Sequence, residues 1–207
     1  MRLKGILILF LTVFVFHLRE AQAFNFTAVA GAPWSTAAVD PVNGFSTSSH
    51  YLSYGGGALF GFKMAQKLQM ELGVLYLSRG YDRNFPDGTA TEYTFTTLQL
   101  PLVLKFQVFP ALWLGFGGYF SHGIGTVQSY PVNGASSVTN TPYSFSTFGA
   151  DDYGPMVSLS LKFSLVPYVS LLVDGRYLLG LANVSQSSNG SIYFRDAQLL
   201  AGIMFGM

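Results

Sequence analysis

The chain has 207 residues, of which half are apolar and 16% are aromatic, while only 10% are charged and none is cysteine. Soluble domains carry about 25% charged residues, so this composition argues against an ordinary water-soluble protein. The formal net charge of +1 gives no reason to expect a nucleic-acid partner, and without cysteine neither a cysteine nucleophile nor a thiolate metal site can form.

The N-terminal segment has the pattern of a secretory signal peptide. A basic start precedes the apolar run 6–16 and an Ala-Gln-Ala motif at 21–23, which is the order of a signal sequence and its cleavage site. The apolar run is too short to span a bilayer core of about 30 Å as a helix. We therefore expect residues 1–23 to be cleaved and residues 24–207 to form a single domain.

Eight segments of the remaining chain alternate apolar and polar residues, as strands with two different faces do. They are 24–34, 50–64, 68–82, 92–108, 112–126, 153–165, 169–182 and 191–206. Tight turns are expected at 65–67, 109–111 and 166–168, and longer polar connections at 35–49, 83–91, 127–152 and 183–190. Short turns that alternate with long loops are typical of bacterial outer-membrane barrels, whose short turns are periplasmic. The prediction is an all-β, eight-stranded antiparallel transmembrane β-barrel with up-and-down topology.

The two faces of the strands differ in a way that favours a membrane barrel. In the fourth segment Leu100, Leu102 and Leu104 share one face, whereas Gln99 and Lys105 share the other. The other well-patterned segments repeat this arrangement of a broad apolar face and a narrow polar one. A soluble lipocalin-like barrel has the reverse order, with an apolar interior. We therefore expect the apolar face to contact lipid and the polar face to line the lumen.

The fourth segment also resembles a known family. Its run Leu98-Gln99-Leu100-Pro101-Leu102-Val103-Leu104-Lys105-Phe106 is similar to a strand of the PorT-like outer-membrane β-barrel domain family, and more distantly the chain resembles small OmpX- and OmpA-type barrels. The segment 194–205 is similar to the last strand of that family, although this chain ends Phe205-Gly206-Met207 rather than on the usual aromatic residue. The resemblance implies a bacterial outer-membrane location. The partners it implies are outer-membrane lipid, lipopolysaccharide and the barrel-assembly machinery.

The only constellation of chemically active groups is a set of charged residues on the inward face. The candidates are Lys63, Glu71, Lys105, Lys162, Asp174, Arg176 and Asp196, with Arg79 nearer the rim. Eight strands leave an interior that side chains can fill, and buried charges must be paired. We expect a salt-bridged, largely closed lumen in which three acids leave one base over. The alternative is a narrow polar conduit, which would make the protein a low-conductance channel or transporter for small polar solutes.

The connection 127–150 contains no charged residue and holds four aromatic ones, Tyr130, Tyr143, Phe145 and Phe148. Aromatic side chains among small polar residues suit adaptable binding, so these are candidates for contact with an extracellular ligand or protein partner. They could equally rest on the barrel rim in the interfacial belt. The leading functional prediction is accordingly a structural scaffold, or a protein that interacts or adheres through its surface loops.

An enzyme is the weakest alternative. A lipid-active outer-membrane enzyme would need a His, a Ser and a carboxylate near the outer rim. Ser121 and His122 are candidates, but neighbours on a strand point to opposite faces. His50 stands at the start of the second segment, and Asp151 and Asp152 lie near the same rim. We therefore predict no catalytic residue. Because no phosphate-binding loop or metal-ligand spacing is present, we also predict no cofactor and no metal.

Overall fold

The computed structural model describes residues 24–39, 46–48, 51–84, 90–131, 139–142, 149–184 and 191–206. The predicted signal segment 1–23 lies outside the described residues, as do His50, Tyr143, Phe145 and Phe148. All the regular structure of these described residues is β-strand. None of the described residues form a helix of the length and apolar character that crossing a membrane requires.

Eight long strands form the wall of the molecule. They are β1 (Phe24–Val39), β4 (Gly55–Ala65), β5 (Leu68–Asn84), β6 (Ala90–Gln107), β7 (Leu112–Gly123), β10 (Asp151–Val166), β11 (Val169–Leu179) and β12 (Ile192–Gly206). Four short strands accompany them: β2 (Ser46–Ser48), β3 (Tyr51–Leu52), β8 (Thr126–Pro131) and β9 (Thr139–Pro142).

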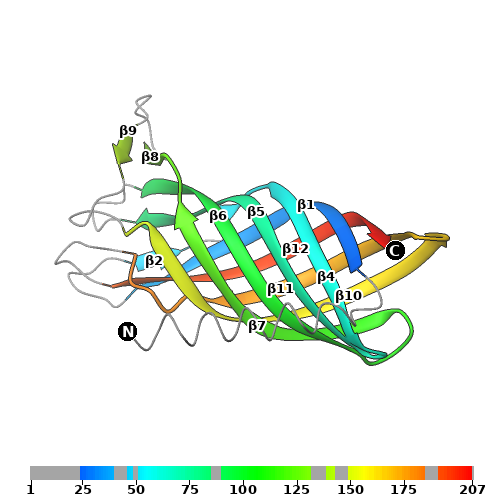
Figure 1. The fold of residues 1–207 in the computed structure, drawn as a ribbon. Coiled ribbons are helices and arrows are strands. Elements are labelled where there is room, and N and C mark those ends of the chain that lie inside the picture. The colour runs from blue at the N-terminus through cyan, green and yellow to red at the C-terminus, as the bar shows by residue number, and fades with distance from the viewer. Residues whose placement is uncertain are drawn as a thin grey trace, which may run out of the picture.

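The long strands pair in chain order and close into a ring. Each pair from β1–β4 to β11–β12 is antiparallel, and β1 pairs with β12 from Asn25↔Gly206 to Val39↔Ile192. Tight connections join β4 to β5, β6 to β7 and β10 to β11, all at one end of the ring (Figure 1). This is the predicted up-and-down barrel of eight strands. By the rule for outer-membrane barrels we expect the end with tight turns to be periplasmic, and we call it the periplasmic end.

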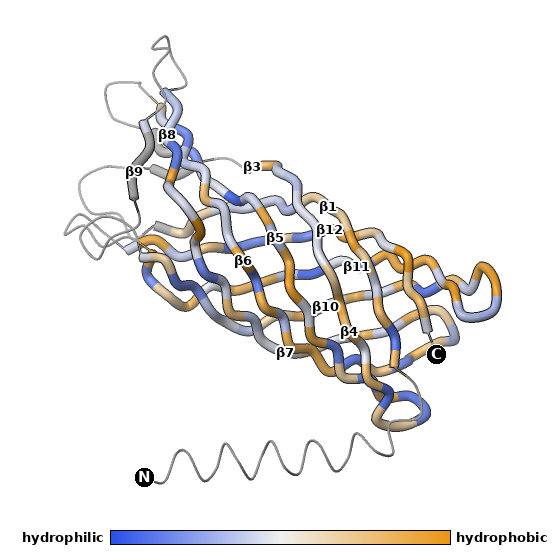
Figure 2. Tube along the Cα trace, turned by 45° about the horizontal axis from the view of Figure 1, so that its top comes forward, coloured by the Kyte–Doolittle hydropathy of each residue, from blue (hydrophilic) through white to orange (hydrophobic). Residues whose placement is uncertain are grey.

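The predicted facing of the strands is confirmed. Along β6 the residues Leu100, Leu102 and Leu104 are exposed on the outer surface, while Gln99 and Lys105 are buried inside. β10 repeats this order, since its apolar residues 157, 159, 161 and 163 are exposed and Ser158 and Ser160 are buried. Figure 2 shows the resulting change between hydrophobic and hydrophilic positions along the wall. The exposed apolar surface suits contact with lipid, because exposing these side chains is unfavourable in water but not in the hydrocarbon core of a bilayer.

The prediction was wrong about the outer end of the barrel. The connection predicted at 127–152 contains most of β8, all of β9 and the start of β10. β8 pairs with β6 and β9 pairs with β8, so the wall continues as a sheet beyond the ring (Figure 1). The predicted strand 50–64 is instead divided into β3 and β4. Strands that leave the membrane have no lipid-facing side, so their sequences lose the alternation by which the others were found.

Three apolar clusters occupy the inside of the barrel between its polar groups. One draws on β5, β4, β1, β12 and β11 and contains Val29, Leu59, Leu75, Leu77, Leu172 and Leu200. A second contains Val103, Tyr119, Met156 and Leu178. The third, which we call the upper aromatic cluster, lies toward the outer end and contains Tyr81, Phe95, Val127, Val184, Ile192 and Phe194. Side chains therefore fill the interior, as expected for a ring of eight strands.

Candidate functional site

Four charged side chains form a cluster near the periplasmic end of the lumen. Lys105 Nζ lies 2.9 Å from Glu71 Oε2 and 2.9 Å from Asp174 Oδ2. Arg176 Nη2 contacts the same two carboxylates, at 2.7 Å from Glu71 Oε1 and 2.7 Å from Asp174 Oδ2. Ser160 donates a further hydrogen bond to Asp174 Oδ1 at 2.9 Å. We call Glu71, Lys105, Asp174 and Arg176 the lower charge cluster.

The lower charge cluster is both buried and balanced. Its two cations and two carboxylates come from β5, β6 and β11, and each side chain is at most 4% exposed. Burying a charge is tolerated only where an opposite charge and hydrogen bonds replace water. Each carboxylate here receives both cations, so the removal of any one member leaves its partners incompletely compensated. The ion pairs thus connect β5 and β6 with β11 across the lumen, although β11 is far from them in the sequence.

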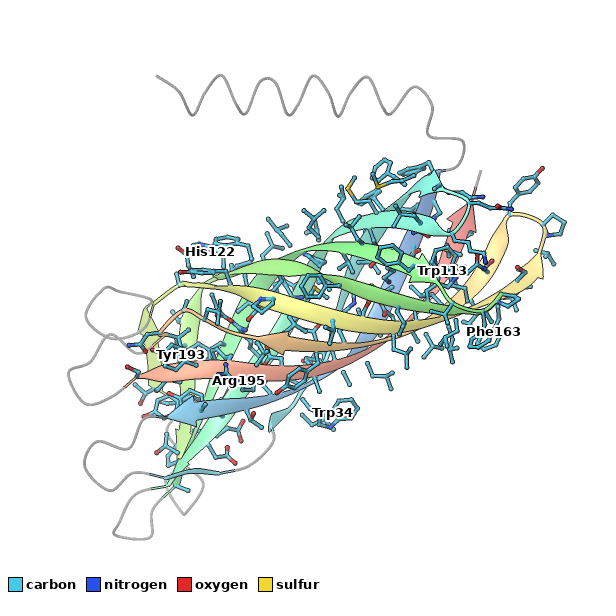
Figure 3. The ribbon with its side chains drawn as sticks, turned by 90° about the horizontal axis from the view of Figure 1, so that it is seen from below. Trp34, Trp113, His122, Phe163, Tyr193 and Arg195 are labelled. Carbon is cyan, nitrogen blue, oxygen red and sulfur yellow. The ribbon has the colours of Figure 1, made fainter. Side chains whose placement is uncertain are left out.

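Lys162 lies beside this cluster toward the periplasmic mouth. Its Nζ donates a hydrogen bond to Gln69 Oε1 at 2.6 Å and lies 4.0 Å from the centre of the Trp113 ring. A cation over the face of an indole ring is attracted by the negative charge of that face. Figure 3 shows Trp113 toward the end of the barrel that carries the tight turns. Lys162 therefore has polar and aromatic partners rather than a direct ion pair.

A second cluster of charged side chains lies in the lumen closer to the outer end of the barrel. Arg79 Nη1 lies 2.8 Å from Asp152 Oδ2 and 3.1 Å from Asp196 Oδ2. Tyr119 donates its hydroxyl to Asp152 Oδ2 at 2.9 Å, and the Arg79 guanidinium carbon is 4.1 Å from the centre of the Phe194 ring. We call Arg79, Asp152 and Asp196 the upper charge cluster. It contains two carboxylates but a single cation.

The two clusters are separated along the lumen by a hydrogen-bonded glutamine pair and by apolar side chains. Gln198 donates its amide to Gln99 Oε1 at 2.9 Å, and both residues are buried. Beyond the upper charge cluster, the upper aromatic cluster packs its rings together, with Phe95 and Phe194 edge to face at 5.3 Å between ring centres. The interior is thus filled at successive levels by charged, amide and aromatic side chains.

The structure places six of the seven charged residues predicted for the lumen inside it: Glu71, Lys105, Lys162, Asp174, Arg176 and Asp196. Lys63 is the exception, because it lies two residues before the end of β4 and its side chain is exposed. The prediction that the lumen contains one base more than acids is therefore wrong. Asp152, which the prediction left in a loop, is fully buried. Continuing the inward positions Ser160 and Ser158 back along the strand in steps of two reaches Asp152, and this signal could have found it.

The predicted catalytic candidates do not come together. Ser121 is buried inside the barrel, whereas His122 points outward, as the alternation predicts. The Nδ1 atom of His122 lies 2.6 Å from Asp151 Oδ1, and both side chains are more than half exposed. Figure 3 shows His122 on the outer half of the wall, well away from Trp113 and Phe163. Within the described residues, this His–Asp pair therefore has no serine as an adjacent nucleophile on its own face, since Ser121 points to the other side.

Of the four aromatic residues predicted as loop contacts, only Tyr130 lies among the described residues. It belongs to β8, pairs with Glu92 of β6, and donates its hydroxyl to Gln128 Oε1 at 2.7 Å. Tyr130 is thus part of the sheet that extends beyond the ring. The described part of the chain contains no group of three or more His, Asp or Glu side chains that could hold a metal ion.

Comparison with solved structures places the fold among small outer-membrane barrels. OprG of Pseudomonas aeruginosa superposes with a TM-score of 0.55 at 12% identity, covering 90% of this chain and 96% of OprG. Neisserial surface protein A gives a TM-score of 0.43 at 15% identity, over 88% of this chain and 96% of that one. Ail of Yersinia pestis, solved with a heparin analogue, gives 0.45 at 10% identity, over 89% and 99%.

Sequence comparison identifies the family. No curated protein matches the chain. The family described as "Outer membrane protein beta-barrel domain" matches residues 20–186, which is most of the sequence. The exposed apolar belt, the closed ring of eight strands and this match agree, and the chain belongs to the outer-membrane β-barrel domain family.

Proposed function

We propose that this protein is a non-conducting, non-enzymatic barrel of the bacterial outer membrane that acts through its outer end, as a structural scaffold or as an interaction or adhesion protein. The observation that carries the proposal is the filled lumen. Seven charged side chains are buried there in two clusters, and Lys162 is partly buried beside them. Hydrated ions would have to displace paired, buried charges to pass, which is strongly unfavourable.

The sheet beyond the ring supports a role at the cell surface. β5 and β6 pair from Leu68↔Phe106 to Asn84↔Ala90, and β6 continues the sheet through β8 and β9 (Figure 1). Backbone pairing holds this extension in a defined shape, which lowers the entropy lost when a partner binds. We propose that the segment 127–150, which includes β9 and most of β8, binds an extracellular ligand or protein.

The closed lumen is tested by single-channel recording. The refolded chain 24–207 is inserted into planar bilayers in KCl, after heat-modifiable migration on a gel has shown that it is folded. We expect no current. A steady, ion-selective conductance that changes in Lys105→Met or Asp174→Asn would overturn the proposal and make the charge clusters part of a pathway.

The proposed surface role is tested with cells that carry the full-length protein or a variant lacking 127–150. Adhesion to surfaces coated with collagen, mucin or heparin is measured, with equal surface amounts of both proteins. We expect the deletion to reduce adhesion to at least one coating. Equal adhesion to all three would count against 127–150 as the binding segment.

A low-conductance channel is the second candidate, and one observation favours it. Buried polar atoms without a hydrogen-bond partner occur at several levels of the lumen, including Gln69 Nε2, Ser158 Oγ, Gln99 Nε2 and Gln198 Oε1. Such atoms usually bind ordered water, and a line of water could support slow passage of small polar solutes. The bilayer recording above separates this candidate from the closed barrel.

Two finer assignments remain proposals. Membership of the PorT-like subgroup rests on the motif of residues 98–106, which forms the second half of β6. Insertion by the barrel-assembly machinery, among lipid and lipopolysaccharide, rests on the resemblance of β12 to the last strands of that subgroup.

A lipid-active enzyme is the weakest candidate. It predicts that His122→Ala abolishes a lipid turnover in a barrel that still folds.

A further inference from the structure

The upper charge cluster has an uncompensated negative charge. Among the side chains that the structure describes, Arg79 is the one cation between Asp152 and Asp196, and none of the three is more than 5% exposed. In the lower charge cluster, two cations face two carboxylates. Lys162 makes the count equal over the whole lumen, but it lies at the periplasmic mouth against Trp113. An unbalanced charge this deeply buried is strongly unfavourable unless another positive charge joins it.

Several buried oxygen atoms at this cluster have no hydrogen-bond partner. Both carboxylates use their Oδ2 atoms for the single Nη1 of Arg79. Their Oδ1 atoms are buried and have no hydrogen-bond partner. Ser121 Oγ is also buried and without a partner, and Ser121 is the direct cross-strand neighbour of Asp152 on the inner face. Ser35, fully buried as well, stands opposite Asp196 on the neighbouring strand, and its hydroxyl interacts favourably with the Asp196 carboxylate.

The carboxylate of Asp152 packs closely against Gly180. A Cβ atom added at Gly180 would lie 2.8 Å from Asp152 Oδ1 and 2.9 Å from the Phe194 carbonyl oxygen. The glycine therefore allows the carboxylate to lie against the backbone of the neighbouring strand. The upper aromatic cluster lies on the outer side and limits the access of bulk water. The result is an oxygen-rich, negatively charged site closed off by rings.

We propose that the upper charge cluster is a binding site for one monovalent positive charge, held by Asp152, Asp196 and the hydroxyl of Ser121. A sodium ion and a proton are the two sources of that charge. A divalent ion would leave the cluster with an excess positive charge, and calcium requires six to eight oxygen ligands. This proposal does not depend on the function proposed above.

The test is equilibrium unfolding in urea of the refolded chain 24–207 in detergent micelles, followed by the fluorescence of its two tryptophans, of which Trp113 is buried. NaCl is exchanged for choline chloride at constant ionic strength, at pH 8 and at pH 5. If sodium is bound, the midpoint rises with Na⁺ concentration to a plateau at pH 8. If the proton is bound, the midpoint is the same in both salts and rises as the pH falls. A midpoint that responds to neither Na⁺ nor pH, beyond the response of Asp196→Asn, overturns the proposal.

Matched variants assign the effect to the site. Asp196→Asn removes the excess charge, so its midpoint should not respond to Na⁺ and should lose the pH response that distinguishes the wild type. Asp174→Asn makes the same chemical change in the lower charge cluster and should keep the wild-type response. Ser121→Ala leaves the charges in place and should raise the Na⁺ concentration needed for half of the effect several-fold. If Asp196→Asn does not fold, Asp152→Asn replaces it; a Na⁺ or pH response unchanged in Asp152→Asn also overturns the proposal.

Discussion

The two charge clusters of the lumen are built from the same kinds of residue but solve different electrostatic problems. The lower charge cluster shares two cations between two carboxylates, and the contacts range from 2.7 to 2.9 Å. The upper charge cluster has one cation for two carboxylates and leaves an oxygen of each without a partner. The lower cluster thus has the charge balance expected of a structural closure. The upper cluster has the excess negative charge expected of a site that binds an additional positive charge.

The largest expected effect comes from breaking the balanced cluster. Lys105→Met leaves Glu71 and Asp174 with Arg176 alone, and an uncompensated buried charge costs about 3–5 kcal/mol. We expect the free energy of unfolding, measured by urea titration in detergent micelles, to fall by about this amount.

A second substitution checks that charge rather than packing causes the loss. Lys105→Met with Glu71→Gln restores the balance of charge and should recover part of the lost stability. If the double variant is as unstable as the single one, or less stable, the lost packing of the Lys105 side chain would explain the effect instead.

The next prediction compares the same substitution in the two clusters. Asp174→Asn removes a carboxylate that accepts hydrogen bonds from Lys105 and Arg176, and hydrogen bonds to charged groups contribute about 1.5–3 kcal/mol each. Because the amide oxygen of Asn can still accept one of them, we expect the substitution to destabilise the barrel by about 2–3 kcal/mol. Asp196→Asn removes excess charge and should destabilise it much less in choline chloride at pH 8. Equal losses in the two variants would show that the clusters do not differ in charge balance.

The sequence carried enough information for the wall of the barrel and most of the lumen. Residues between lipid and a polar interior must alternate, so the pattern located all eight long strands and placed residues such as Lys105 and Asp174 correctly. The same reasoning failed at the outer end of the barrel, where the strands no longer lie between lipid and a polar interior. β8 and β9 lie beyond the ring and have no lipid face, and Asp152 lies at the point where β10 begins. The pairing partners of each charge could not be predicted, because they depend on strand register and on the stagger of a closed ring.

Crowding at the upper charge cluster gives a third prediction. Gly180→Ala would place a methyl group 2.8 Å from Asp152 Oδ1 and 2.9 Å from a backbone oxygen. Overpacking in a filled interior costs about 1–3 kcal/mol, so we expect a loss of unfolding free energy in that range. The variant should also weaken the response of the barrel to Na⁺ or pH. A substitution at the open position Gly206, which has no neighbouring atom within 4 Å of an added Cβ, serves as the control and should change neither.

The smallest effect is expected at Lys63, and it separates position in the pattern from position in the barrel. Lys63 and Lys105 both stand at inward positions of their strands, but Lys63 lies near the turn at the end of β4 with its side chain exposed, whereas Lys105 is fully buried. An exposed substitution away from special features changes stability by about 0.5 kcal/mol or less. We expect Lys63→Met to unfold at the wild-type urea concentration, in the titration in which Lys105→Met loses several kcal/mol. A large loss in Lys63→Met would mean that the lower charge cluster reaches the periplasmic turn, and that the balance of two cations and two carboxylates is incomplete without this lysine.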